Sequence, residues 1–232
     1  MPIIKLALLL IVILAIIYFI FYSRFFQISD VIVEGNQLVA KEDIVKNVPQ
    51  GQNIFLTKGE TTRQAILDHI PEVRDVQIYK GIPDAIKVVV LEHNRALLWK
   101  SGDRYYLISS EGYVYRDVSL KVNDFTNLPR IEDNSKIPVV LGTKIVSPSF
   151  VAFVQNISAN LFSTINIEPD YFSISETTFD LNLKTKAGFT VKFDTLRSSK
   201  KQLDDLKRVL TEKRDQINEY VDLRIDGWAY YK

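Results

Sequence analysis

The chain has 232 residues, of which 47% are hydrophobic and 25% charged, and its formal net charge is +1. This composition supports one or two compact domains and excludes a disordered chain. The near-neutral charge argues against nucleic acid as a partner, and the absence of cysteine excludes disulfides, thiolate metal sites and cysteine nucleophiles.

Residues 6–22, LALLLIVILAIIYFIFY, carry no charge and lie between Lys5 and Arg24. As a helix this run is about 26 Å long, close to the roughly 30 Å of a bilayer core. A cleaved signal peptide is the alternative, but it requires a shorter apolar run that ends in small residues rather than aromatic ones. We therefore predict that residues 1–24 form a short cytoplasmic end and an uncleaved transmembrane helix. The excess of positive charge at the amino end predicts that the rest of the chain is extracytoplasmic.

Residues 25–95 predict a first domain with the order strand, helix, helix, strand, strand. The first strand is expected over 26–34 and the first helix over 41–48. The spacing of Thr61 and Gln64 predicts a capping box that opens the second helix, and alternating apolar residues predict two further strands over 75–78 and 86–90. Two helices on one face of a three-stranded sheet would bury these apolar residues together.

Residues 96–232 predict a mostly antiparallel β domain with flanking helices. Hairpins are expected over 96–116, a connection over 117–137 and a helix over 148–162. The clearest hairpin spans 179–193. A helix over 197–214 follows, with a buried stripe of Leu203, Leu206 and Leu210, and this crossover predicts that the last strand is parallel to an earlier one or at a sheet edge.

Residue patterns typical of catalysis are weak. His69 and His93 stand apart from any acidic cluster, so no zinc site is predicted. The S-x-x-K sequence from Ser198 to Lys201 lacks its companion motifs and is interpreted as the capped start of a helix. Two carboxylates at suitable separation would suffice for a glycosidase, which the sequence does not exclude. We predict no catalytic, cofactor-binding or metal-binding residues and no enzymatic activity.

Several sequence features occur together in a fixed order. The apolar anchor is followed by V-x-V-x-G-N at Val31–Asn36, G-x-N-I-F at Gly51–Phe55, P-x-V-x-x-V at Pro71–Val76, and the closing YVDLRIDGWAYYK. In this order they resemble the FtsQ/DivIB family of bacterial cell-division proteins over nearly the whole chain. Two departures are Arg95, where the family usually has a proline near the domain boundary, and Ala40, where a hydroxyl usually caps the first helix.

The resemblance implies an α+β protein in which a single transmembrane helix is followed by a POTRA domain (β-α-α-β-β) and a β domain. It implies a noncatalytic adaptor at the division septum that links early and late division proteins. It also implies regulation of septal peptidoglycan synthesis through FtsB/DivIC-like and FtsL-like partners. Other membrane proteins of the division complex would be further partners through the POTRA domain, the lipid bilayer would be contacted through residues 6–22, and no cofactor is implied.

The terminal residues alternate between apolar and polar side chains, which is typical of a half-buried strand. Val221, Leu223 and Ile225 are expected to face inward, and Arg224, Trp228 and Tyr230 outward unless a bulge at Gly227 exchanges the faces. The resemblance implies that this last strand is the edge to which a partner adds a strand. The predicted partner-binding residues are Tyr220, Val221, Asp222, Leu223, Arg224, Ile225, Trp228, Ala229, Tyr230 and Tyr231.

Two alternative functions stay open at this stage. A POTRA-bearing secretion or envelope-assembly factor would normally carry several such domains or a barrel. A membrane-anchored, wall-active hydrolase would have a cleft with two convergent carboxylates.

Overall fold

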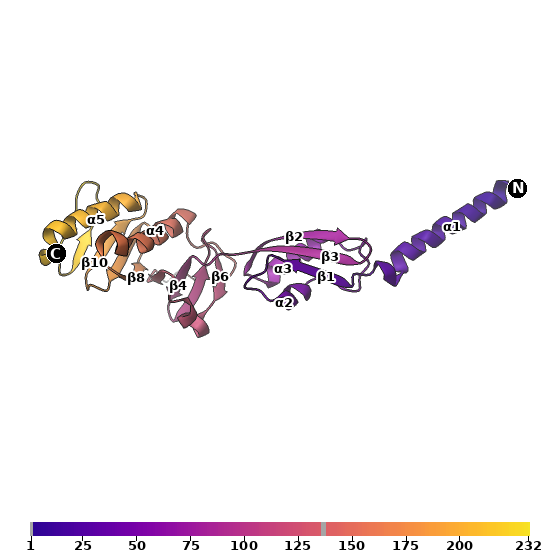
Figure 1. Cartoon of the computed structure of the whole chain (residues 1–232), viewed down its shortest axis with the longest axis horizontal. Helices are drawn as coiled ribbons and strands as arrows, with labels where there is room; N and C mark the ends of the chain where they lie inside the picture. Colours follow the sequence, from indigo (N-terminus) through magenta and orange to yellow (C-terminus); the bar gives the residue numbers. More distant parts are fainter. Residues whose placement is uncertain (1, 136–137) are drawn as a thin grey trace. The chain divides into compact units, whose positions relative to one another are not determined.

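The computed structural model describes residues 2–135 and 138–232. The described residues divide into two compact units, the first up to residue 93 and the second from residue 94 onward (Figure 1). The elements of the first unit are α1 (Pro2–Tyr22), the 3₁₀ turn η1 (Arg24–Phe26), β1 (Asp30–Glu34), α2 (Lys41–Val45), α3 (Gly59–His69), β2 (Val73–Gly81) and β3 (Ala85–Glu92).

Helix α1 contains the apolar run. Its segment Ile3–Tyr22 is, among the described residues, the one helix long and apolar enough to cross a membrane. Apart from the half-buried Ile20, its side chains from Ile3 to Tyr22 are exposed. An apolar helix without a protein core around it is what a bilayer-spanning segment requires, and it is consistent with a single-pass membrane protein.

The rest of the first unit has the predicted order of strand, helix, helix, strand, strand. Among residues 2–93, three strands form a sheet in the order β1-β3-β2, with β1 parallel and β2 antiparallel to β3. Alternate residues of β3, Ile86 and Val88, are fully buried together with Ile44 of α2 and Ile66 of α3. Both helices therefore pack on one face of the sheet.

Three boundaries in this domain differ from the sequence prediction. Helix α3 begins two residues before Thr61, and its N-cap is Lys58, so the predicted capping box is wrong. The Lys58 carbonyl accepts the Thr62 amide at 3.3 Å, so the first hydrogen bond of the helix starts from Lys58 rather than from Thr61. Helix α2 is shorter than predicted, because tight three-residue turns follow Val45. Strand β1 begins at Asp30 rather than at Phe26, which belongs to η1.

The elements of the second unit are β4 (Leu97–Ser101), β5 (Arg104–Ile108), β6 (Val114–Asp117), the 3₁₀ segment η2 (Ser119–Phe125), β7 (Arg130–Asp133), α4 (Pro148–Ile165), β8 (Pro169–Ile174), β9 (Asp180–Thr185), β10 (Thr190–Asp194), α5 (Ser199–Lys213), the 3₁₀ turn η3 (Arg214–Gln216), β11 (Tyr220–Asp222) and β12 (Tyr230–Tyr231). Within the described residues, nine strands form one sheet in the order β12-β11-β10-β9-β8-β7-β4-β5-β6.

The two faces of this sheet are covered differently. Helices α4 and α5 pack on one face, where Phe172 of β8 and Phe193 of β10 belong to the main core. The other face has a smaller cluster in which Leu98 and Leu107, directly opposite each other on β4 and β5, pack against Phe125 of η2. The alternation of side chains along each strand fills both layers.

Both helix starts follow sequence signals. The Ser147 hydroxyl caps α4 by accepting the amide of Phe150 at 3.1 Å. The Ser198 hydroxyl caps α5 by accepting the amide of Lys201 at 3.3 Å, which confirms the structural interpretation of the S-x-x-K sequence. Because α5 connects β10 to β11, these two strands are parallel, as the crossover predicted.

Two strands in the middle of the sheet, β7 and β8, were not predicted. The stretch 117–137, interpreted as a connection, contains η2 and β7, and residues 136–137 lie outside the described ones. Strand β7 lies between β4 and β8 and is parallel to both. The remaining strand pairs are antiparallel apart from β10 with β11, so the predicted fold class, α+β with a mostly antiparallel second domain, is confirmed.

Candidate interaction surface

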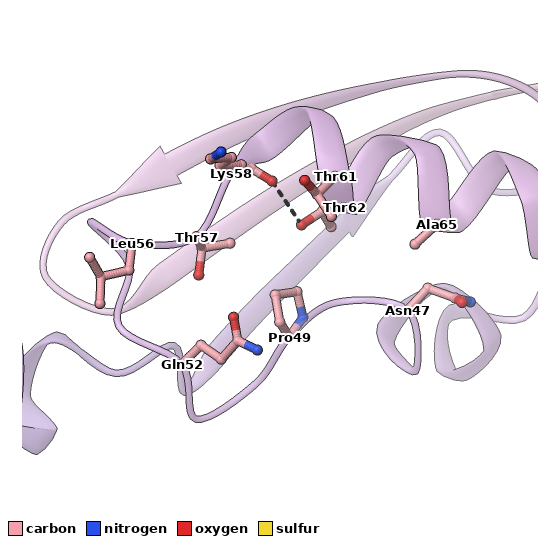
Figure 2. Close-up of a pocket in the computed structure, with 9 residues that line it drawn as sticks. All are labelled: Asn47, Pro49, Gln52, Leu56, Thr57, Lys58, Thr61, Thr62 and Ala65. Atoms are coloured by element: carbon pink, nitrogen blue, oxygen red, sulfur yellow. Dashed lines mark hydrogen bonds between the residues drawn. The ribbon is translucent and has the colours of Figure 1, made fainter.

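Two hollows among the described residues bring together no recognisable set of catalytic groups. One hollow of about 360 Å³ in the first unit lies between the end of α2 and the start of α3 (Figure 2). Its lining is mostly amides, hydroxyls and methyl groups, and Lys58 is its one titratable residue. The Thr62 hydroxyl beside it donates to the Lys58 carbonyl and completes the first turn of α3.

A second hollow, of about 270 Å³, contains two neighbouring carboxylates, Glu132 and Asp133 of β7. Successive residues of a strand point to opposite faces. Glu132 pairs with Lys100 at 3.4 Å, and Asp133 is buried, where it accepts the amide of Ser135 at 2.9 Å. This pair therefore does not converge on one bond in the way that a glycosidase pair does.

The histidines also stand apart from each other. His69 closes α3 with its ring Nδ1 2.7 Å from the Ala65 carbonyl, and the His93 amide donates to the Glu72 carbonyl after β3. No group of three or more histidine and acidic side chains able to hold a metal ion occurs among residues 2–135 and 138–232.

The carboxyl-terminal segment is a hairpin at one edge of the large sheet. Strand β11 pairs in parallel with β10, and the Leu223 amide continues this ladder by donating to Lys192 at 2.9 Å. On its other side β11 pairs antiparallel with β12. Tyr220 and Lys232 exchange both backbone hydrogen bonds, at 3.1 and 3.2 Å. Strand β12, not β11, is therefore the outermost strand.

This hairpin corrects the prediction of one continuous strand reaching residue 231 as a free edge. Strand β11 ends at Asp222, and the chain reverses through a turn in which Gly227 has a φ of +74°. Val221 and Leu223 face the core as predicted, but Ile225 does not, because it lies in the turn and is 55% exposed. Alternation alone does not reveal a reversal that a glycine in a left-handed conformation makes possible.

Charged side chains hold this turn in place. The Arg197 guanidinium donates to the Leu223 carbonyl at 2.6 Å and also pairs with Asp226. Lys201 donates to the same Asp226 carboxylate at 2.7 Å. The hydrogen bond and charge of Lys201, with the charge of Arg197, lower the pKa of Asp226 below its usual value. The turn is thus fastened to the beginning of α5.

Arg224 is engaged in the same way and is not a free cation. Its Nη2 lies 2.7 Å from Asp222 and its Nη1 lies 3.0 Å from Asp180 at the start of β9. Burial acts to raise the pKa of Asp222, but the hydrogen bonds and charge of Arg224 outweigh it and hold this pKa below the usual value. The two aspartates raise the pKa of Arg224, so this group of charges joins the ends of β9 and β11.

The predicted site residues divide into three groups. Val221 and Leu223 are core residues, and Ala229 and Tyr231 pack against the same core. Tyr220, Asp222 and Arg224 are half-buried within the sheet and its charge cluster. The exposed members are Ile225, Trp228 at 68% and Tyr230 at 52%. Exposed aromatic side chains beside an outer strand are typical of a protein-binding surface.

The other edge of the large sheet is occupied by the chain itself. Along β6, the Val114 amide donates to Thr143 at 2.9 Å and the Val114 carbonyl accepts the Gly142 amide at 2.7 Å. The segment around these residues therefore covers β6 as an added strand would. In the part of the chain that the structure describes, no segment pairs with the outer side of β12.

Among the described residues, one apolar helix, a β-α-α-β-β domain and a β-rich domain follow one another, an arrangement consistent with a single-pass membrane protein that has two folded domains. Residues 26–93 match the family description "POTRA domain, FtsQ-type". Residues 97–224 match "Cell division protein FtsQ/DivIB, C-terminal". The chain belongs to the FtsQ/DivIB family. The second match ends at Arg224, so the turn and β12 lie beyond it.

Relatives carry cell-division names. The chain is similar to cell division protein FtsQ of Chloroflexus aurantiacus, with 30% identity over 132 residues, 56% of this chain and 47% of the relative. It is similar to cell division protein DivIB of Clostridium botulinum, with 26% identity over 218 residues, 88% of this chain and 80% of the relative. The chain spans about half the length of the Chloroflexus relatives that it matches.

Proposed function

We propose that the protein is a noncatalytic adaptor of the bacterial division machinery. In this proposal α1 crosses the plasma membrane, the amino end is cytoplasmic, and both folded units work outside the cytoplasm at the septum. The protein links early and late division proteins and regulates septal peptidoglycan synthesis through FtsB/DivIC-like and FtsL-like partners. Membership of the FtsQ/DivIB family and the cell-division names of its relatives support this role.

The observation that carries the proposal is the open outer side of β12. Backbone hydrogen bonds alternate in direction along an antiparallel pair. The backbone N–H and C=O groups of Tyr230 and Lys232 point towards β11, so the backbone N–H and C=O groups of Tyr231 point away from the sheet. A partner strand binds these groups by strand addition, and the exposed rings of Trp228 and Tyr230 supply side-chain contacts beside it.

The test needs a substitution that removes the outward donor and leaves the fold intact. Truncation before β11 is unsuitable, because Val221 and Leu223 are buried and their loss would damage the core. Proline at position 231 removes one N–H group, which faces away from β11, and proline is tolerated in edge strands. Tyr231→Ala is the matched control, since it removes the same side chain and keeps the N–H group.

We expect Tyr231→Pro to weaken binding about tenfold relative to Tyr231→Ala, the effect of one lost hydrogen bond and a steric clash with the partner backbone. Binding of the full chain in detergent micelles to the soluble domains of the organism's FtsB/DivIC-like and FtsL-like pair would be measured by calorimetry. Equal affinities of the two variants would contradict strand addition at β12. An absence of binding by the wild type would contradict the proposed partners.

A further inference from the structure

One end of the POTRA domain is bonded directly to the last turn of α1. The buried Asn53 side chain donates from Nδ2 to the Ile20 carbonyl at 2.7 Å and to the Phe21 carbonyl at 3.2 Å. These carbonyls belong to the carboxyl end of the helix, where backbone acceptors lack partners within the helix. Asn53 therefore caps α1 from within the folded domain.

Aromatic rings reinforce this connection. Phe19 of α1 lies edge-on to Phe26 of η1 with 5.8 Å between ring centres. Phe26 in turn lies 5.3 Å from Phe55, which follows the capping Asn53 by two residues. Helix and domain are thus joined by packing and hydrogen bonds, so the position of one along the membrane normal constrains the other.

Three separate segments meet at this end of the domain. The Ile54 amide donates to the Phe26 carbonyl at 2.8 Å, which places the loop 51–58 beside η1. The Ser29 amide donates to the Asp84 carbonyl at 3.0 Å, which places the turn between β2 and β3 beside the start of β1. Segments distant in sequence therefore form one surface.

Each of these three segments carries exposed apolar side chains. The four are Phe25 at 58%, Phe55 at 43%, Leu56 at 64% and Ile82 at 68% exposure, and we call them the membrane-proximal tip. Exposed basic residues, Arg24, Lys58 and Lys80, lie within two residues of them in sequence. Apolar and aromatic side chains flanked by lysine and arginine are typical of a surface in the lipid headgroup region.

We propose that the membrane-proximal tip inserts into the headgroup region of the same bilayer that α1 crosses. The occupant follows from continuity with the helix: Ile20 and Phe21 lie in the last turn of the apolar span Ile3–Tyr22, and Asn53 contacts their carbonyls. The headgroup region extends several ångströms beyond the hydrocarbon core. Residues that are hydrogen-bonded to the end of a membrane-spanning helix must therefore lie within this headgroup region.

The local geometry keeps the tip close to this boundary. The Leu56 amide donates back to the Asn53 carbonyl at 3.1 Å, so the loop turns tightly rather than extending away from α1. The proposal rests on α1 spanning the membrane, as the proposed function also requires. It adds a second lipid contact that fixes the orientation of the POTRA domain on the membrane.

The absence of cysteine from the chain allows single labels to be introduced cleanly. Leu56→Cys and Ile82→Cys would each carry an environment-sensitive fluorophore in the full chain, reconstituted into phosphatidylcholine–phosphatidylglycerol vesicles. Leu91→Cys is the matched control: its side chain is 53% exposed and lies about 20 Å along β3 from Ala85, which pairs with Asp30 near α1. Ile13→Cys, within α1, reports on spanning.

Nitroxide lipids labelled near the headgroup should quench positions 56 and 82 several-fold more strongly than position 91, and deep nitroxides should quench position 13. Quenching at position 13, together with quenching at positions 56 and 82 that is no stronger than at position 91, would overturn the tip proposal and leave the anchor intact. Shielding of the tip from aqueous iodide without nitroxide quenching would mean that protein covers it, which also overturns the proposal. No deep quenching at 13 would overturn both proposals.

Discussion

At the scale of single residues, Arg224 links two strands of the second unit through its charge. It binds Asp222 and Asp180 at once and thereby joins β11 to the start of β9 across β10. A buried carboxylate is stable only when paired, so removing one member of such a group costs more than the pair contributes. The sequence identified Arg224 as a site residue by its position on the strand, but its two partners come from residues that only folding brings together.

We expect Arg224→Met to lower the free energy of unfolding of the second unit by about 1–2 kcal/mol at neutral pH, because Asp222 loses its charge-assisted hydrogen bonds and Arg224 is partly exposed. The folded pKa of Asp222 lies below its unfolded value of about 3.9. Its stabilising contribution is therefore complete above that value and is lost as pH falls through the folded pKa.

The difference between wild type and Arg224→Met should consequently shrink as pH falls below the unfolded pKa of Asp222, about 3.9, and through its lower folded pKa. Urea unfolding at neutral and acidic pH, followed by tryptophan fluorescence, measures it. Both tryptophans, Trp99 and Trp228, lie in the second unit. Arg208→Met, which removes an exposed pair with Asp205 at 3.7 Å, is the control and should change stability by less than about 0.5 kcal/mol. A pH-independent difference would contradict this account.

At the scale of elements, the turn between β5 and β6 depends on Gly112. Its φ is +89°, and a Cβ atom there would lie 1.9 Å from the Val146 carbonyl oxygen. Residues 142–146 cover the edge of β6 and require this close approach, since the Ile145 amide donates to the Gly112 carbonyl at 3.0 Å. The same turn thus forms the hairpin and closes the sheet edge.

We expect Gly112→Ala to destabilise the second unit by at least about 3 kcal/mol, because backbone strain adds to a steric clash that only displacement of residues 145–146 relieves. Gly188→Ala is the matched control. Its φ is +98°, but no atom lies within 4 Å of the added Cβ, so only strain of about 1–2 kcal/mol is expected. Urea unfolding measured by tryptophan fluorescence compares the two variants; equal losses of stability would mean that residues 145–146 do not constrain the turn.

Predictability from sequence also varied by element. The hairpin of β9 and β10 was predicted because its strands alternate cleanly, with Leu181, Leu183, Val191 and Phe193 all buried. Strand β7 was missed because RIED contains one apolar residue, Ile131, and its identity as a strand comes from β4 and β8 on either side. Pairing between distant segments is not encoded in local periodicity.

The candidate site shows the same limit. The alternation of Val221 and Leu223 correctly predicted two buried residues. The pattern continued through Ile225, but the charges of Arg197 and Lys201 on α5 hold the chain in a turn there. A contact between a helix and a loop 25 residues further along the chain leaves no signal in the alternation, so the prediction treated β11 and the outermost strand β12 as one continuous strand.

At the scale of the whole molecule, the two units have separate cores among the described residues. Ile66, fully buried, belongs to the core of the first unit, and Leu183, fully buried, belongs to that of the second. Each unit can therefore lose packing without removing a core contact of the other.

We expect Ile66→Ala to lower the stability of the first unit by about 2–5 kcal/mol through loss of buried surface and the cavity left behind, and Leu183→Ala to do the same for the second unit. Both tryptophans report on the second unit, so the fluorescence transition in urea should shift for Leu183→Ala and stay unchanged for Ile66→Ala. Hydrogen exchange of peptides from residues 26–93 should become faster in Ile66→Ala and stay unchanged in Leu183→Ala. A fluorescence shift caused by Ile66→Ala would mean that the two cores unfold as one cooperative structure, because only coupling between the units transmits a cavity in one core to Trp99 in the other.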